Sequence, residues 1–188
     1  MAELTQSPGG IPYRVSGQGT PPFIFVGQLE ASASPWAAQV ANLSRDRLCV
    51  EVQARNADDV EEVLGVLRPG PALIAAAHED AMTALLFCEL YPEAVNGIVL
   101  VDPPLPPADE QEHARTESLV KLADKKPFMV IWPEAPAGSP GWLRDIAMFV
   151  RQEPVAGAPS EPRTEQPDIT NALFRAFLDD VKNDPRLP

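Results

Sequence analysis

The chain contains two histidines, and the neighbours of one of them could support acid–base chemistry. Glu79 and Asp80 follow His78 directly, and Asp102 ends a later apolar run. A carboxylate partner raises the basicity of an imidazole and fixes its tautomer. A His78–Asp102 dyad could therefore act as a general base; alternatively, Asp102 only closes a turn and His78 is an exposed turn residue. His113 lies on a polar helical pattern and is expected at the surface.

A metal centre is not expected at this turn. Three adjacent residues rarely converge on one ion, and the chain has no CxxC or HExxH spacing. Cys49 and Cys88 both lie in apolar surroundings and are expected to be buried thiols. We therefore predict no metal and no other cofactor.

The elements that position His78 are predicted to be a strand, a tight turn, a helix and a second strand. The apolar runs 72–76 and 98–101 are short enough for buried strands, and 81–90 is a nearly all-apolar helical segment. The strands of such a βαβ unit are parallel, so their carboxyl ends lie at one edge of the sheet. His78 and Asp102 should then lie together at the edge where open α/β sheets bind ligands.

The whole pattern predicts an α/β fold: a doubly wound, mostly parallel sheet with helices on both faces. Further strands are expected at 11–15, 23–26, 48–52 and 127–132, and further helices at 35–43, 56–67, 109–124, 141–151 and 168–182. We expect a single domain over 1–188, with a flexible N-terminus at 1–10 and a proline-rich loop at 154–167 that replaces the last strand.

This order of elements resembles the α/β-hydrolase superfamily, which carries its nucleophilic serine in a G-x-S-x-G turn, the nucleophile elbow. The likeness lies in the flanks of the turn, including Tyr91-Pro92-Glu93-x-Val95 and the strand that ends at Asp102. Counting back from Pro92 places the family's nucleophile at His78. The resemblance implies the fold, but the reactive serine is absent.

The resemblance also implies positions for the other two members of the catalytic triad. The acid falls on Pro136, where Glu134 is the only nearby carboxylate, and the histidine falls on Ala158. All three catalytic residue types are therefore replaced, which removes the serine mechanism. The chain after Asp102 is also too short for the lid of a larger hydrolase.

Gly27 and Gln28 match the family's loop that supplies one backbone N–H of the oxyanion hole. The alternative is a plain tight turn after a strand. Together with Glu79, they are our candidate ligand-binding residues.

The elbow itself is expected to have relaxed. Asp80 stands where the family has a small residue, and its carboxylate could cap the helix that begins at Ala81. A capped turn would leave His78 with a negative φ.

Composition narrows the possible partners. The formal net charge of -12 argues against nucleic acid and anionic membrane surfaces. No apolar run approaches the roughly 18 residues that span a bilayer, and the N-terminus lacks a secretory signal pattern, so a cytoplasmic location is expected.

Two functions are compatible with these observations. The first is a non-catalytic, degenerate hydrolase that binds a protein partner, a second copy of itself or a small ligand. Its contact is expected along the final helix and the segment 154–167. The second is a serine-independent enzyme that uses His78 as base, Asp102 or Glu134 as its partner, and the Gly27 and Gln28 amides as oxyanion donors. Its substrates would be small esters, thioesters or carbonyl compounds.

Overall fold

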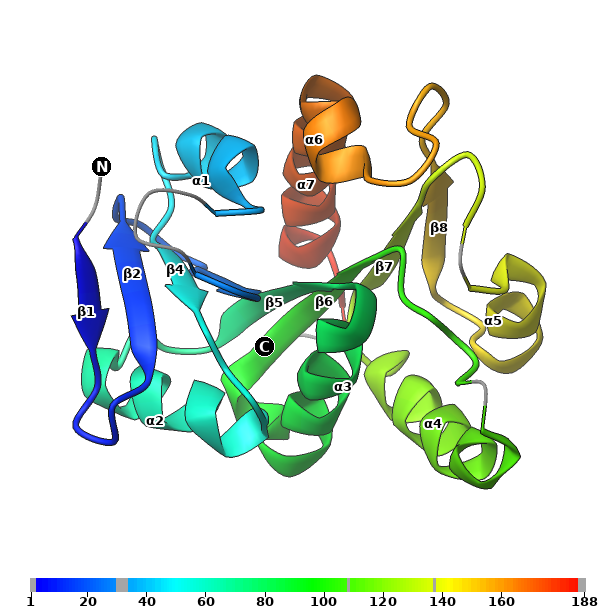
Figure 1. The fold of residues 1–188 in the computed structure, drawn as a ribbon, viewed down its shortest axis with the longest axis horizontal. Coiled ribbons are helices and arrows are strands. Elements are labelled where there is room, and N and C mark those ends of the chain that lie inside the picture. The colour runs from blue at the N-terminus through cyan, green and yellow to red at the C-terminus, as the bar shows by residue number, and fades with distance from the viewer. Residues whose placement is uncertain (1–2, 30–33, 108, 137, 186–188) are drawn as a thin grey trace.

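An eight-stranded sheet runs through the molecule in the order β1-β2-β4-β3-β5-β6-β7-β8, with helices on both faces (Figure 1). The computed structural model describes residues 3–29, 34–107, 109–136 and 138–185. All neighbours from β4 to β8 are parallel, whereas β1 and β2 join the sheet as antiparallel strands. The predicted doubly wound, mostly parallel sheet is confirmed.

The strands are β1 Leu4–Gln6, β2 Pro12–Ser16, β3 Phe23–Val26, β4 Cys49–Val52, β5 Ala72–Ala77, β6 Val95–Val101, β7 Phe128–Trp132 and β8 Arg151–Pro154. The helices are α1 Ala37–Leu43, α2 Ala57–Leu67, α3 Ala81–Leu90, α4 Glu110–Ala123, α5 Pro140–Ile146, α6 Pro162–Glu165 and α7 Pro167–Lys182. Two 3₁₀ turns, η1 His78–Asp80 and η2 Pro92–Ala94, precede and follow α3.

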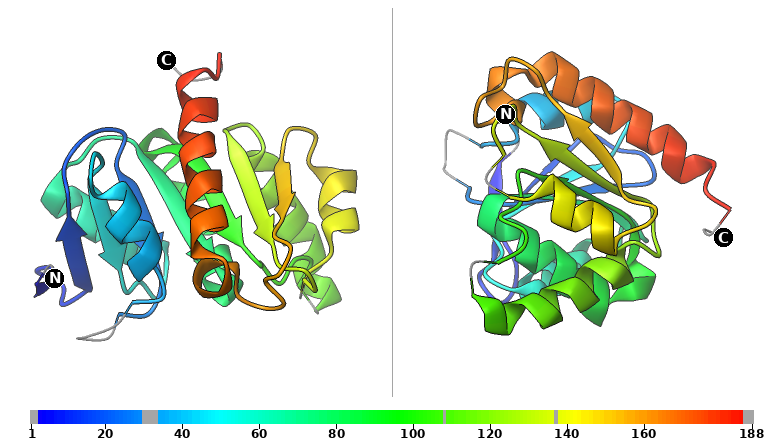
Figure 2. Two further views of the ribbon diagram at one scale, coloured as in Figure 1. Left: turned by 90° about the horizontal axis from the view of Figure 1, so that it is seen from above. Right: turned by 90° about the vertical axis from the view of Figure 1, so that its right-hand side faces the viewer.

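The sheet separates two apolar cores. Helices α2 to α5 contribute to the core on one face, and α1 and α7 contribute to the core on the other (Figure 2). Strand β5 is buried at every position, and its side chains alternate between the two cores: Ile74 faces one, and Leu73 and Ala75 face the other. This burial on both faces explains why the strand has a continuous apolar sequence.

Strands β5 and β6 bring the two candidate site residues to one edge. Their register runs from Ala72↔Val95 to Ala77↔Val101, the last residue of each strand. His78 and Asp102 each follow directly, so both lie at the carboxyl edge of the sheet.

Three local predictions are wrong. The last strand is present: β8 pairs in parallel with β7 at the sheet edge. The helix expected over 141–151 ends at Ile146, and α6 forms within the proline-rich segment. Residues 4–6 of the expected flexible N-terminus form β1, which pairs with β2 at the edge of the sheet. Edge strands carry polar side chains, so they lack the apolar run by which buried strands are predicted.

Candidate functional site

His78 retains the strained backbone of an elbow. Its φ is 49°, in the left-handed region, and the expected negative φ is wrong. Asp102 is also in this region, with a φ of 43°. The left-handed conformation costs a non-glycine residue roughly 1–2 kcal/mol, and such strain persists mainly at active sites and ligand clamps. The turn is sharp because only the three residues of η1 separate β5 from α3.

Asp80 does not cap α3, contrary to the prediction. Its φ of -68° and ψ of -14° are helical, and its side chain accepts no cap hydrogen bond. The turn η1 runs directly into α3, so the Ala81 amide bonds to the carbonyls of His78 and Glu79 instead. The Ala81 amide therefore has backbone acceptors and does not need the Asp80 carboxylate. That carboxylate instead lines a pocket.

The imidazole of His78 is bound by a carboxylate that the sequence did not indicate. Its Nε2 lies 2.8 Å from Glu161 Oε2, which is a hydrogen-bond distance. Its Nδ1 lies 3.7 Å from Asp102 Oδ2, close enough for charge attraction but too far for a hydrogen bond. The predicted alternative, Glu134, is exposed, and its side chain neither hydrogen-bonds nor pairs with a charge among the described residues. Glu161 is therefore the direct partner of His78.

Arg163 holds Glu161 in place. The buried guanidinium donates from Nε to Glu161 Oε1 at 2.8 Å and from Nη2 to Oε2 at 2.6 Å. It also lies over the Trp36 ring, 4.3 Å from the ring centroid. A two-pronged contact of this kind fixes both position and orientation. Asp102, His78, Glu161 and Arg163 thus form a chain of alternating charge when the imidazole is protonated.

The charges of these four side chains shift the pKa values of Glu161, His78 and the nearby Asp80. Burial alone would raise the pKa of Glu161, but hydrogen bonds from Arg163 and His78 outweigh it and lower the pKa to about 2. The hydrogen bond to Glu161 raises the pKa of His78, although burial partly opposes it. Burial also raises the pKa of Asp80, against the attraction of Arg163. The pair therefore favours an imidazolium beside an ionised Glu161.

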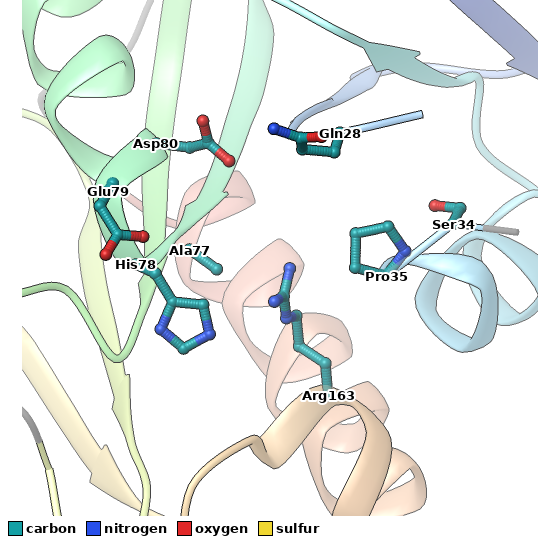
Figure 3. A pocket seen from close by; sticks show the side chains of 8 residues that line it. All are labelled: Gln28, Ser34, Pro35, Ala77, His78, Glu79, Asp80 and Arg163. Carbon is teal, nitrogen blue, oxygen red and sulfur yellow. The ribbon is translucent and has the colours of Figure 1, made fainter. Parts of the chain in front are cut away.

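A cavity of about 620 Å³ opens at this edge of the sheet (Figure 3). We call it the elbow pocket; it is lined by Gln28, Ser34, Pro35, Ala77, His78, Glu79, Asp80 and Arg163. The side chains of Gln28 and Asp80 extend toward each other, and Arg163 reaches up from α6 between His78 and Pro35. The predicted ligand-binding residues Gln28 and Glu79 therefore both line a pocket.

The third predicted ligand-binding residue, Gly27, has a structural role. Its N–H donates to the Val52 carbonyl at 3.1 Å, so that amide is not available to an oxyanion. A Cβ at Gly27 would lie 3.2 Å from Trp36 Nε1, which explains a glycine at this position. Gly27 lets Trp36 pack closely against the end of β3.

The described residues around the elbow provide no activated nucleophile. Ser34 is the hydroxyl residue among those that line the pocket, and its Oγ accepts from the Trp36 amide at 3.0 Å. Burial raises the pKa of Cys49 to about 12 and that of Cys88 to about 11, so both thiols stay protonated. Ala158, the position assigned to the family's histidine, is fully buried, and the segment after β8 brings Glu161 to the elbow instead.

Within residues 3–29, 34–107, 109–136 and 138–185, no three histidine, cysteine or acidic side chains are grouped as metal ligands. None of the helices in these ranges has the length and apolar composition of a membrane span.

Solved structures share this fold at low sequence identity. A membrane phospholipase A described as a bacterial virulence factor is 15% identical, with a TM-score of 0.78 over 98% of this chain and 87% of that one. An esterase from Thermogutta terrifontis is 15% identical, with a TM-score of 0.70 over 96% and 97%. A meta-cleavage product hydrolase from Pseudomonas fluorescens is 12% identical, with a TM-score of 0.75 over 96% and 98%. No model of a known protein family and no curated protein matches the chain. The chain has the α/β-hydrolase fold.

Proposed function

We propose that this chain is a non-hydrolytic α/β-hydrolase-fold protein that binds a small polar ligand in the elbow pocket. The observation that carries the proposal is the 2.8 Å contact between His78 Nε2 and Glu161 Oε2. It places a histidine and its carboxylate where the fold needs a nucleophile and a base. The strain retained at His78 agrees with a ligand clamp as well as with a catalytic site.

The free polar groups of the pocket define the ligand chemistry. Arg163 is neutralised by Glu161, whereas Asp80 makes no hydrogen bond or ion pair to the described residues. The Gln28 amide faces Asp80, and Glu79 adds a second carboxylate. A small ligand with hydrogen-bond donors, such as an amine, an amide or a polyol, would pair with these acceptors.

Calorimetry with a panel of small amines, amides and polyols tests this proposal. We expect at least one compound to bind the wild-type protein and to lose affinity by roughly tenfold in Asp80→Asn, since a hydrogen bond to a charged group contributes about 1.5–3 kcal/mol. Glu134→Gln is the matched control because Glu134 is an exposed carboxylate outside the pocket. Equal losses in both variants, or no binding across the panel, would contradict the proposal.

The strained elbow also supports a second function, general-base catalysis. With Nε2 bound to Glu161, a neutral His78 would present Nδ1, which lies near Asp102, as its basic atom. The substrates would be small esters, thioesters or carbonyl compounds. Turnover that is lost in His78→Gln and reduced in Glu161→Gln would favour this function over pure binding.

A further inference from the structure

Two large apolar side chains project beside the last strand. Met148 and Phe149 lie between α5 and β8 and are 83% and 64% exposed. The backbone that carries them is held by Asp124, whose carboxylate accepts from the Met148 amide at 2.7 Å and the Phe149 amide at 3.0 Å. Exposed apolar side chains that lie next to each other, rather than scattered singly, form the kind of patch that marks a contact site.

Strand β8 leaves one side of the sheet unpaired. It is the outermost strand, and Figure 2 (right) shows it on the side of the molecule facing the viewer, next to α5. Val155 donates to the Trp132 carbonyl at 2.8 Å, so odd-numbered residues direct their backbone groups toward β7. By this alternation, the N–H and carbonyl of Gln152 point away from the sheet and can bond to another strand.

We propose that β8 pairs antiparallel with β8 of a second copy of this chain, about a two-fold axis at Gln152. In this register the two Gln152 residues exchange both backbone hydrogen bonds. Arg151 of each copy then lies opposite Glu153 of the other, so the four-residue strand is complementary in charge to itself. Such an isologous contact closes on itself and forms a dimer rather than a fibre.

The neighbouring residues fit this arrangement. Pro154 has no N–H to donate, which restricts the pairing to a short stretch. Met148 and Phe149 precede the strand and would add apolar area from each copy. The opposite edge, β1, is only Leu4–Gln6 and has no charges to set a register. The proposed contact at 147–154 differs from the surface expected from the sequence, the final helix and the segment 154–167.

Sedimentation and light scattering at micromolar concentration test the dimer. Arg151→Glu would place like charges opposite each other twice and should weaken dimerisation by roughly tenfold or more. Arg151→Glu and Glu153→Arg, mixed, should form a heterodimer, because each strand then meets opposite charges in its partner. Neither single variant keeps the contact between Arg151 and Glu153 within one copy, so that contact cannot explain pairing in the mixture. A wild-type protein that is still monomeric at about 100 µM would overturn the proposal, because a dimer of micromolar affinity would form at that concentration. A dimer that is insensitive to Arg151→Glu would also overturn it.

A cross-link provides a second, independent measurement. Gln152→Cys places one thiol from each copy beside the two-fold axis, and mild oxidation should give a covalent dimer. Leu90→Cys, at an exposed site on α3, is the control and should remain largely monomeric. The native cysteines are buried and should not react. Equal cross-linking of both variants would overturn the proposed register, and circular dichroism would confirm that each variant is folded.

Discussion

His78 stands at the position of the family's nucleophilic serine, and a carboxylate, Glu161, contacts it from the segment in which the family carries its histidine. Asp102 was predicted from sequence because it ends an apolar strand next to that of His78. Glu161 was not, because it lies 83 residues away in a segment without a periodic pattern. A carboxylate before Pro162 does indicate a helix start, but no local signal indicates its distant partner.

The pair should make the titration of His78 depend on Glu161. The hydrogen bond to Glu161 raises the pKa of His78 above the ordinary 6.5, so we expect Glu161→Gln to lower it. NMR of the ring protons measures this change, and His113→Gln identifies the other histidine signal. An unchanged His78 pKa in Glu161→Gln would show that the two side chains are not paired in solution.

The same pair gives stability a defined pH window. The raised pKa of His78 contributes stability that is complete below its ordinary pKa of about 6.5. This contribution is lost as the pH rises through the pKa of His78 in the folded protein. The lowered pKa of Glu161 contributes stability above its ordinary 4.5 that is lost as pH falls toward about 2. Urea unfolding of the wild type and His78→Gln should therefore differ most between about pH 4.5 and 6.5. A difference that grows above pH 8 would contradict this sign.

Restoring a serine at the elbow should not restore hydrolysis. In His78→Ser the nearest groups would be the carboxylates Glu161 and Asp102, with no histidine beside the serine to take its proton, and Arg163 would still lower the pKa of Glu161. We expect no labelling of this variant or of the wild type by a fluorophosphonate probe and no turnover of nitrophenyl esters above background. Labelling of the wild type would mean that a serine elsewhere is activated.

Elements with a strong apolar pattern were predicted well, and polar elements were not. The run Ala72–Ala77 is buried on both faces, so composition alone identified β5, and the strand and helix that follow it were found in the same way. Strand β8 consists of Arg, Gln, Glu and Pro, with half-buried or exposed side chains, and its pairing with β7 is set by tertiary structure. Exposed edge strands are therefore the elements that sequence patterns miss.

The starts of α2 and α3 differ in capping, and this difference can be measured. Asn56 Oδ1 accepts from the Asp59 amide at 3.0 Å and so caps α2, whereas the expected cap of α3 by Asp80 is absent. Asn56→Ala should lower the free energy of unfolding by about 1 kcal/mol, and Asn56→Ser should restore most of it. Asp80→Ala should show no cap penalty because the carboxylate is half-buried and unpaired among the described residues. Equal losses in the two alanine variants would contradict this assignment.

The layered architecture could be predicted from sequence because both cores follow simple periodicities. Strand side chains alternate between the faces, and α7 repeats its apolar residues along one side. The placement of α6 could not be predicted, since it depends on where α7 docks on the sheet. Arg163 of α6 packs over the Trp36 ring and donates to Glu161, which in turn contacts His78 at the elbow. Packing on the α1 and α7 face of the sheet therefore positions the candidate site.

The aromatic cluster under α7 should therefore control both stability and the site. Phe174 is fully buried, with ring centroids 5.7 Å from Phe23, 6.1 Å from Phe25 and 6.1 Å from Trp36. Phe174→Ala should cost about 3–5 kcal/mol because it removes a large buried side chain and leaves a cavity. Ile169→Ala is the control on the same helix; this side chain is 45% exposed and should change stability by about 0.5 kcal/mol or less.

Urea denaturation of the two variants measures this difference, with equal m-values showing that the unfolding transition is unchanged. Because Trp36 contacts both Phe174 and the Arg163 guanidinium, we also expect Phe174→Ala to loosen the hold of Arg163 on Glu161. The His78 pKa, read by NMR, should then move toward its ordinary value in Phe174→Ala but not in Ile169→Ala. A destabilised Phe174→Ala protein with an unchanged His78 titration would show that α6 is held over the elbow by contacts other than this cluster.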